Sequence, residues 1–202
     1  MNIHLHQGDL PEGVLQGSLV AVDTEAMGLK PWRDRLCLVQ LSAGDGVVHI
    51  VQFFADQPVP NLKKILIDPS IGKIFHFARF DVALLMHSLG VVTTPLYCTK
   101  IASRLVRTFT DRHSLKDLCK ELLGVEISKQ EQTSDWGSPQ LSKEQLRYAA
   151  TDVLHLHALK QKLDVLLARE NRLELAEACF RFVPYRAQLD LWGGEENDIF
   201  HH

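Results

Sequence analysis

Residues 18–26 read SLVAVDTEA, in which an apolar run from Leu19 to Val22 is followed by two carboxylates, Asp23 and Glu25. A short apolar run of this kind predicts a buried strand. Residues two apart on a strand project to the same face, so Asp23 and Glu25 are expected to point together from the end of the strand. The stretch therefore predicts a core strand that carries a paired acidic site.

Two later segments, both predicted to be helices, add further carboxylates. Asp81 opens the apolar helix predicted for FDVALLMHSLG, where the helix dipole favours an acid near the N-terminus. Tyr148 and Asp152 lie four residues apart in KEQLRYAATDVLHLHALKQKL, which has apolar residues at helical spacing. That separation places both side chains on one helix face, about one turn apart.

Four carboxylates in a small volume repel one another unless cations neutralise them. Hard divalent cations such as Mg²⁺ or Mn²⁺ prefer oxygen ligands. Two such ions roughly 3.5–4 Å apart can activate a water and stabilise the leaving oxygen of an in-line phosphoryl displacement. A tyrosine one helical turn from a ligand suits the orientation of the attacking water. The pattern predicts a nuclease site for two divalent metal ions.

Each residue also has an ordinary structural interpretation. Asp23 and Glu25 suit a solvated strand end, Asp81 suits the start of a helix, and Tyr148 suits a half-buried helix position. The ordered combination on three separated segments favours the metal site over these separate interpretations.

The motifs resemble those of the DEDD superfamily of 3′–5′ exonucleases, and within it the ribonuclease D group with tyrosine in the third motif. The segments that carry the resemblance are VAVDTEAMGL (20–29), IFHFARFD (74–81) and LSKEQLRYAATDVLHL (141–156), the last preceded by SDW (134–136). The resemblance extends over about residues 18–168. One departure is Phe77, where relatives often have Asn, and it affects the local hydrogen bonding but not Asp81.

Within that group the compact length, residues 98–118 (CTKIASRLVRTFTDRHSLKDL) and the ending LWGGEENDIF (191–200) are similar to the nanoRNase C enzymes. The resemblance implies an exoribonuclease for very short RNA, down to dinucleotides, that releases nucleoside 5′-monophosphates. It also implies a homo-octamer. Two alternatives stay open: a general exonuclease on longer RNA or DNA 3′ ends, and a catalytically inactive nucleic-acid-binding scaffold.

The resemblance also implies roles for the five motif residues. Asp23 is expected to bridge two metal ions, with Glu25 and Asp152 completing the first ion's ligands. Asp81 is expected to hold the second ion through water, and Tyr148 to orient the nucleophilic water.

Candidate substrate-binding residues lie close to these motifs. Met27 and Leu29 follow the first motif and suit packing against terminal bases, although ordinary loop packing explains them nearly as well. His76 belongs to the second motif. Arg104 and Arg107 lie in a run of basic residues that suits either a local phosphate clamp or a solvated helix surface.

Bulk properties favour one soluble α/β domain. The chain has 202 residues, 46% of them hydrophobic, and its net charge of −3 favours short substrates over a long polyanion. Four widely spaced cysteines without a CxxC pair and a start without a secretory pattern favour a reducing cytoplasm. No apolar run is long enough to span a membrane.

The predicted fold is a ribonuclease H-like mixed sheet flanked by helices. Strands are expected near residues 2–6, 18–24, 35–42, 46–52 and 72–76, with a Gly44-Asp45-Gly46 hairpin turn. Helices are expected near residues 61–68, 80–89, 99–107, 114–123 and 143–163, the last with a capping box from Ser142 and Gln145. Residues 125–141 are predicted to form a loop.

A catalytic domain is expected over residues 1–170, and residues 171–202 are expected to form a helix interrupted at Pro184 and a tail. This tail, with Trp192, Ile199 and Phe200 as apolar anchors, is expected to pack on the domain or on a neighbouring subunit.

Overall fold

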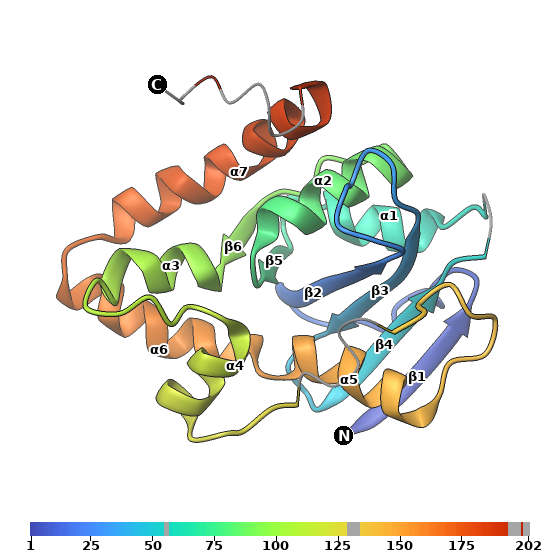
Figure 1. Ribbon diagram of the computed structural model, residues 1–202, viewed down its shortest axis with the longest axis horizontal. Coiled ribbons are helices and arrows are strands. Elements are labelled where there is room, and N and C mark those ends of the chain that lie inside the picture. Colours follow the sequence, from blue (N-terminus) through green and yellow to red (C-terminus); the bar gives the residue numbers. More distant parts are fainter. Residues whose placement is uncertain (55–56, 129–133, 194–198, 200–202) are drawn as a thin grey trace.

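The structure is a computed structural model that describes residues 1–54, 57–128, 134–193 and 199. A six-stranded mixed sheet is flanked by helices (Figure 1). This arrangement confirms the predicted architecture. Part of the predicted loop at residues 125–141, and Phe200 in the tail, lie outside the described residues.

The strand that carries Asp23 and Glu25 lies inside the sheet. The strands are β1 (Asn2–Gln7), β2 (Leu19–Ala26), β3 (Leu36–Ser42), β4 (Val47–Gln52), β5 (Gly72–Phe75) and β6 (Leu96–Cys98). Their order is β1-β4-β3-β2-β5-β6, so β2 pairs antiparallel with β3 on one side and parallel with β5 on the other. The five predicted strands are confirmed. The prediction missed β6, because its three residues are too few to show a periodic pattern.

The turn between β3 and β4 is confirmed at the predicted glycines. Gly44 and Gly46 have φ values of 84° and 83°, which glycine adopts without the steric cost of a Cβ. The Asp45 carboxylate accepts a hydrogen bond from the Val47 N–H at 3.0 Å. The turn thereby fixes the register of β3 against β4.

The helices cover the sheet and one another. They are α1 (Pro60–Ile67), α2 (Ala78–Leu89), α3 (Thr99–Val106), α4 (Leu115–Leu118), the π-helical turn η1 (Cys119–Leu123), α5 (Lys143–Leu154), α6 (Leu156–Arg169) and α7 (Leu173–Gly193). Helix α5 packs across β1 to β4, and α7 runs alongside α2 (Figure 1). The capping box of α5 is confirmed, with the Gln145 N–H donating to Ser142 Oγ at 3.1 Å and the Ser142 N–H donating to Gln145 Oε1 at 2.9 Å.

The prediction of one long helix over residues 143–163 is wrong in its continuity. His155 has φ −101° and ψ −4°, and it ends α5 and begins α6. The break lets α5 pack on the strands while α6 packs on α3, α7 and β5. The apolar pattern runs through His155 without glycine or proline, so the sequence carries no local signal for the break.

The predicted interruption at Pro184 is also wrong, because α7 continues through it to Gly193. A proline inside a helix removes one backbone hydrogen bond and costs about 3 kcal/mol. Buried residues on both sides of Pro184, among them Phe180 and Ala187, hold the two halves in one helix. The Arg79 guanidinium on α2 also pairs with Asp190 on α7, with Nε to Oδ2 at 2.5 Å.

The described part of the chain contains no helix long and apolar enough to cross a membrane. The boundary near residue 170 between a catalytic domain and a C-terminal element stays a prediction, while α7 packs on α2 and α3 of the same chain.

The residue before α2, Phe77, has an unusual backbone conformation. Its φ is 68° and its ψ is 42°, the left-handed region that a bulky residue rarely adopts and that Asn adopts more easily. Its side chain is 46% exposed, and the Lys100 ammonium lies 4.0 Å from the centre of its ring. The departure from Asn therefore carries a local cost in backbone energy.

We expect Phe77→Asn to raise the free energy of unfolding by about 1 kcal/mol, because Asn tolerates this conformation better than Phe. Urea denaturation of both proteins measures the change. Phe109→Asn is the matched control, since Phe109 is 81% exposed and has no positive φ. Equal or lower stability of the Phe77 variant would contradict the expectation.

Candidate active site

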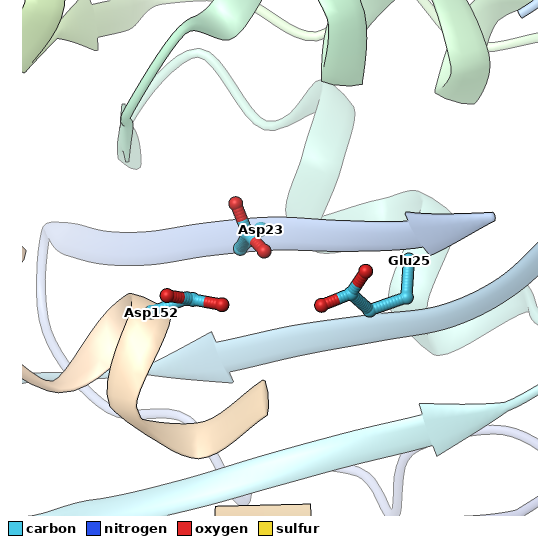
Figure 2. A group of neighbouring side chains, drawn as sticks. All are labelled: Asp23, Glu25 and Asp152. Carbon is cyan, nitrogen blue, oxygen red and sulfur yellow. The ribbon is translucent and has the colours of Figure 1, made fainter. Parts of the chain in front are cut away.

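Three carboxylates meet between the sheet and α5. Asp23 and Glu25 come from β2 and Asp152 from α5, and one ligand oxygen from each lies within 4.8 Å of the other two. Figure 2 shows the Glu25 and Asp152 carboxylates turned toward each other beside Asp23. The predicted projection of Asp23 and Glu25 to the same face of the strand thus brings both to the helix that carries Asp152.

The fourth carboxylate, Asp81, is held through the residue between the pair on β2. Thr24 Oγ1 donates a hydrogen bond to Asp81 Oδ1 at 2.7 Å, and both side chains are buried. Asp81 lies in the first turn of α2, as predicted. The charge of Asp81 also acts on Asp23, Glu25 and Asp152. Strand β2 therefore contacts all four acids: it carries two of them, bonds Asp81 through Thr24 and faces Asp152.

Burial and mutual repulsion make these acids hard to ionise together. Burial, followed by the charges of Asp81, Asp152 and Glu25, raises the pKa of Asp23 well above its usual range. Burial, then Asp152 and Asp81, raises the pKa of Glu25 to about 9. Burial raises the pKa of Asp81 to about 7, and burial with the charge of Asp81 raises the pKa of Asp152 to about 7. The site therefore needs compensating positive charge at neutral pH.

The donor set fits hard divalent cations. Every ligand atom in the cluster is a carboxylate oxygen, the type that Mg²⁺ and Mn²⁺ prefer over nitrogen or sulfur. Cations would supply the missing charge and keep the carboxylates ionised.

Tyr148 lies one turn before Asp152 on α5, half-buried beside the acids. Burial, then the charges of Asp152, Glu25 and Asp23, raises the pKa of its hydroxyl, so it stays protonated. Its ring packs against Trp136 with centroids 5.9 Å apart. Trp136 is 3% exposed and belongs to the SDW segment, for which the sequence alone indicated no contact. This packing holds the orientation of the Tyr148 ring.

The predicted base contacts lie at the end of β2. Met27 is 53% exposed and Leu29 is 87% exposed, so both apolar side chains face solvent. A Cβ at Gly137 would lie only 2.6 Å from Met27 Sδ, so the segment after Trp136 closely approaches Met27. His76 is different, because Thr99 Oγ1 hydrogen-bonds its Nδ1 at 2.9 Å. Burial and then the charge of Lys100 lower the pKa of His76 to about 3, which keeps the ring neutral.

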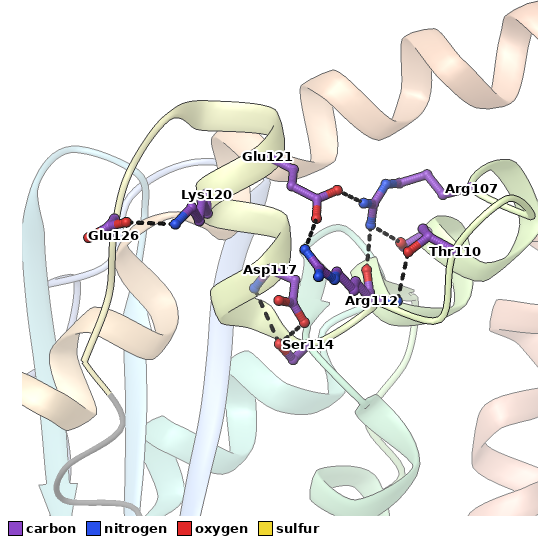
Figure 3. Close-up of polar contacts among 9 residues, drawn as sticks. Arg107, Thr110, Arg112, Ser114, Asp117, Lys120, Glu121 and Glu126 are labelled. Atoms are coloured by element: carbon purple, nitrogen blue, oxygen red, sulfur yellow. Dashed lines mark hydrogen bonds and ion pairs between the residues drawn. The ribbon is translucent and has the colours of Figure 1, made fainter.

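The two predicted arginines are placed differently. Arg104 is exposed on α3, where its charge helps burial to lower the pKa of Lys100. Arg107 is 2% exposed, and its guanidinium donates to Ser103 Oγ and to the Arg112 carbonyl and pairs with Glu121 (Figure 3). The structure therefore leaves Arg104 accessible and turns the Arg107 charge toward the protein.

Comparison with known proteins gives a consistent result. A family model described as 3′–5′ exonuclease matches residues 8–168. Ribonuclease D of Gluconacetobacter diazotrophicus is 36% identical over 155 residues, which are 77% of this chain and 39% of the relative. The chain thus spans about two-fifths of the length of the curated relatives that it matches first.

Solved structures match over the whole chain. Brucella melitensis NrnC with bound Mg²⁺ has a TM-score of 0.94 and 54% identity, with 100% of both chains covered. Brucella melitensis NrnC bound to pGG has a TM-score of 0.96 and 55% identity, with 100% of this chain and 99% of that one covered. Escherichia coli RNase D has a TM-score of 0.83 and 28% identity, with 93% of this chain and 51% of that one covered. These likenesses confirm the predicted fold class and the predicted resemblance.

The raised pKa values lead to a pH dependence of stability. A carboxylate whose pKa is raised by folding contributes stability that is fully present below its unfolded pKa and is lost as pH rises from that value to the folded pKa. The pKa values are raised from the ordinary carboxylate range to about 9 for Glu25 and to about 7 for Asp81 and for Asp152. We expect the metal-free protein to lose stability as pH rises from about 4 to about 9, and Mg²⁺ to stabilise it more at the higher pH.

Thermal unfolding in EDTA and in Mg²⁺ across this range measures the effect. The difference between the two curves removes the contributions of groups outside the cluster, such as Lys73, whose pKa burial lowers to about 8. Stabilisation by Mg²⁺ that does not change with pH would show that the acids are not coupled to the ion.

Proposed function

The chain belongs to the 3′–5′ exonuclease family, and from this premise we propose that it is a metal-dependent exoribonuclease acting on very short RNA. It hydrolyses oligonucleotides from the 3′ end, down to dinucleotides, and releases nucleoside 5′-monophosphates. The observation that carries the proposal is the meeting of Asp23, Glu25 and Asp152 within 4.8 Å, with Asp81 bonded to the intervening Thr24. The match of the whole chain to NrnC bound to pGG supports the short substrate.

Each acidic residue has a separate part in this proposal. Asp23, half-buried beside Glu25 and Asp152, would be the ligand shared by both cations. Glu25 and Asp152 complete the ligands of one ion, and Asp81 holds the second through water. Bound Mg²⁺ or Mn²⁺ supplies an activated water and stabilises negative charge on the leaving oxygen.

Tyr148 orients the attacking water in this proposal and is not a metal ligand. Its raised pKa keeps the hydroxyl protonated, and the contact with Trp136 limits the movement of its ring. The hydroxyl can therefore donate or accept a hydrogen bond in a fixed direction beside Asp152.

Substrate contacts are assigned by exposure and charge. Met27 and Leu29 pack against the terminal bases, and Arg104 meets a phosphate from the exposed face of α3. His76, half-buried and neutral, links the segment before α2 to Thr99 at the start of α3. Arg107 stabilises the segment between α3 and α4 through Glu121 and Arg112.

The exposed apolar side chains of α7 support a homo-oligomer, an octamer by resemblance. Phe182, Tyr185 and Trp192 are 41%, 64% and 75% exposed, and Ile199 in the tail is 61% exposed. A cytoplasmic location is supported by the absence of a disulfide at Cys37, Cys98, Cys119 and Cys179, which are all free.

Incubation with 5′-labelled RNAs of two, three, seven and twenty nucleotides, beside DNA counterparts, tests the substrate. We expect the highest kcat/KM for the RNA dinucleotide in Mg²⁺ or Mn²⁺. Asp23→Asn, which keeps the shape of the side chain but removes the shared charge, is the matched control and should lose nearly all turnover. Preference for the twenty-mer would instead identify a general end-trimming exonuclease.

Tyr148→Phe separates water orientation from metal binding. Loss of a positioned hydroxyl should lower kcat by about 10²-fold or more, while Mn²⁺ affinity stays the same. Single-turnover kinetics and calorimetric titration with Mn²⁺ measure the two quantities. If affinity falls together with kcat, the tyrosine has a role as a ligand or in the fold.

A further inference from the structure

Gln40 on β3 is a buried amide without a hydrogen-bond partner among the residues that the structure describes. Its side chain is 0% exposed, and neither its Nε2 nor its Oε1 forms a hydrogen bond with any of them. We propose that Gln40 is a positioning residue of the metal centre, whose amide N–H donates to the Asp23 carboxylate when cations are bound. This role rests on the proposed metal-dependent function.

The sheet register places Gln40 next to the carboxylates. Gln40 is the antiparallel partner of Asp23, just as Leu38 is the partner of Glu25. Directly opposed residues in an antiparallel pair project to the same face with Cβ atoms about 4.5–5.5 Å apart. The amide therefore emerges on the face of the sheet that carries Asp23, within reach of its carboxylate.

The residues around Gln40 are also buried. All seven residues of β3 are buried, and the next strand places Ile50, 0% exposed, opposite Gln40. Helix α5, which carries Asp152, packs over β3. The other polar side chain of the strand, Ser42, donates to the Val47 carbonyl at 2.7 Å. Gln40 is thus the residue of β3 whose polar side chain forms no hydrogen bond with the described residues.

A buried amide without a partner destabilises a fold, and nearly all such groups in proteins are paired. A residue of similar length without polar atoms, such as Met, would fill the same space without this penalty. The amide at position 40 is therefore explained by a partner that forms in another state of the protein.

Metal binding creates that state. Cations bound by Asp23 would hold its carboxylate in one orientation, so that a lone pair not used by the ions accepts in a constant direction. A donor on the outer side of a metal-binding carboxylate holds its orientation, and loss of such a donor typically weakens metal binding. Gln40 would thus restrict Asp23 to the geometry that two ions share.

Gln40→Met tests the proposal with two readouts that move in opposite directions. Mn²⁺ affinity, measured by calorimetry, should fall roughly 10–100-fold because the outer donor is lost. The melting temperature of the metal-free protein should rise by about 2–4 °C because the unpaired amide is removed. A fall in affinity without a fall in melting temperature also supports the proposal.

Thr93→Val is the matched control. Thr93 is 0% exposed and its hydroxyl also lacks a hydrogen-bond partner in the described part of the chain, but it lies between α2 and β6 rather than on the face of Asp23. This variant should raise the melting temperature and leave Mn²⁺ affinity unchanged.

Two outcomes would overturn the role of Gln40. One is unchanged Mn²⁺ affinity in Gln40→Met, and the other is a lower melting temperature of the metal-free variant, which would assign the amide to the fold itself. Failure of the proposed function is distinguishable, because the unmodified protein would then bind no Mn²⁺ and cleave no dinucleotide.

Discussion

The repulsion among four closely spaced carboxylates, one buried and three half-buried, is the constraint on which this structure depends. Asp23, Glu25 and Asp152 share a space less than 5 Å across, and Asp81 adds its charge from α2. A fold stabilised only by burial of apolar groups would exclude such a cluster, since buried charges without partners are costly. The cost is compensated only when cations join the site. The proposed metal binding and the stability of the fold would therefore depend on the same four residues.

The architecture brings these residues together from segments distant in the chain. Strand β2, enclosed between β3 and β5, presents Asp23 and Glu25 toward α5 and uses Thr24 to bond Asp81. The capping box fixes the start of α5, so Tyr148 and Asp152 reach the strand in a defined rotation. The break at His155 then separates this helix from α6, which packs elsewhere. The rigid elements thus set the geometry of the site, and the exposed Met27 and Leu29 follow closely after the end of β2.

Much of this could be predicted, because the relevant signals are local. Strand periodicity located β2 and the pairing of Asp23 with Glu25, and helical spacing placed Tyr148 beside Asp152. Other features depend on contacts that a linear pattern does not contain. The burial of Arg107 follows from Glu121 in another helix, the continuity of α7 through Pro184 follows from packing on α2, and the turn at His155 follows from two different packing surfaces. Gln40 reads as one polar residue in an apolar strand until the register places it opposite Asp23.

The number of cations bound per chain tests the metal site most directly. Mn²⁺ binding measured by electron paramagnetic resonance, with a dinucleotide analogue that resists hydrolysis, gives both the stoichiometry and the magnetic coupling between ions. Two coupled ions per chain are expected, because the proposed sharing of Asp23 would hold them roughly 3.5–4 Å apart. One ion, or two without coupling, would contradict a shared ligand and require a different assignment of the four acids.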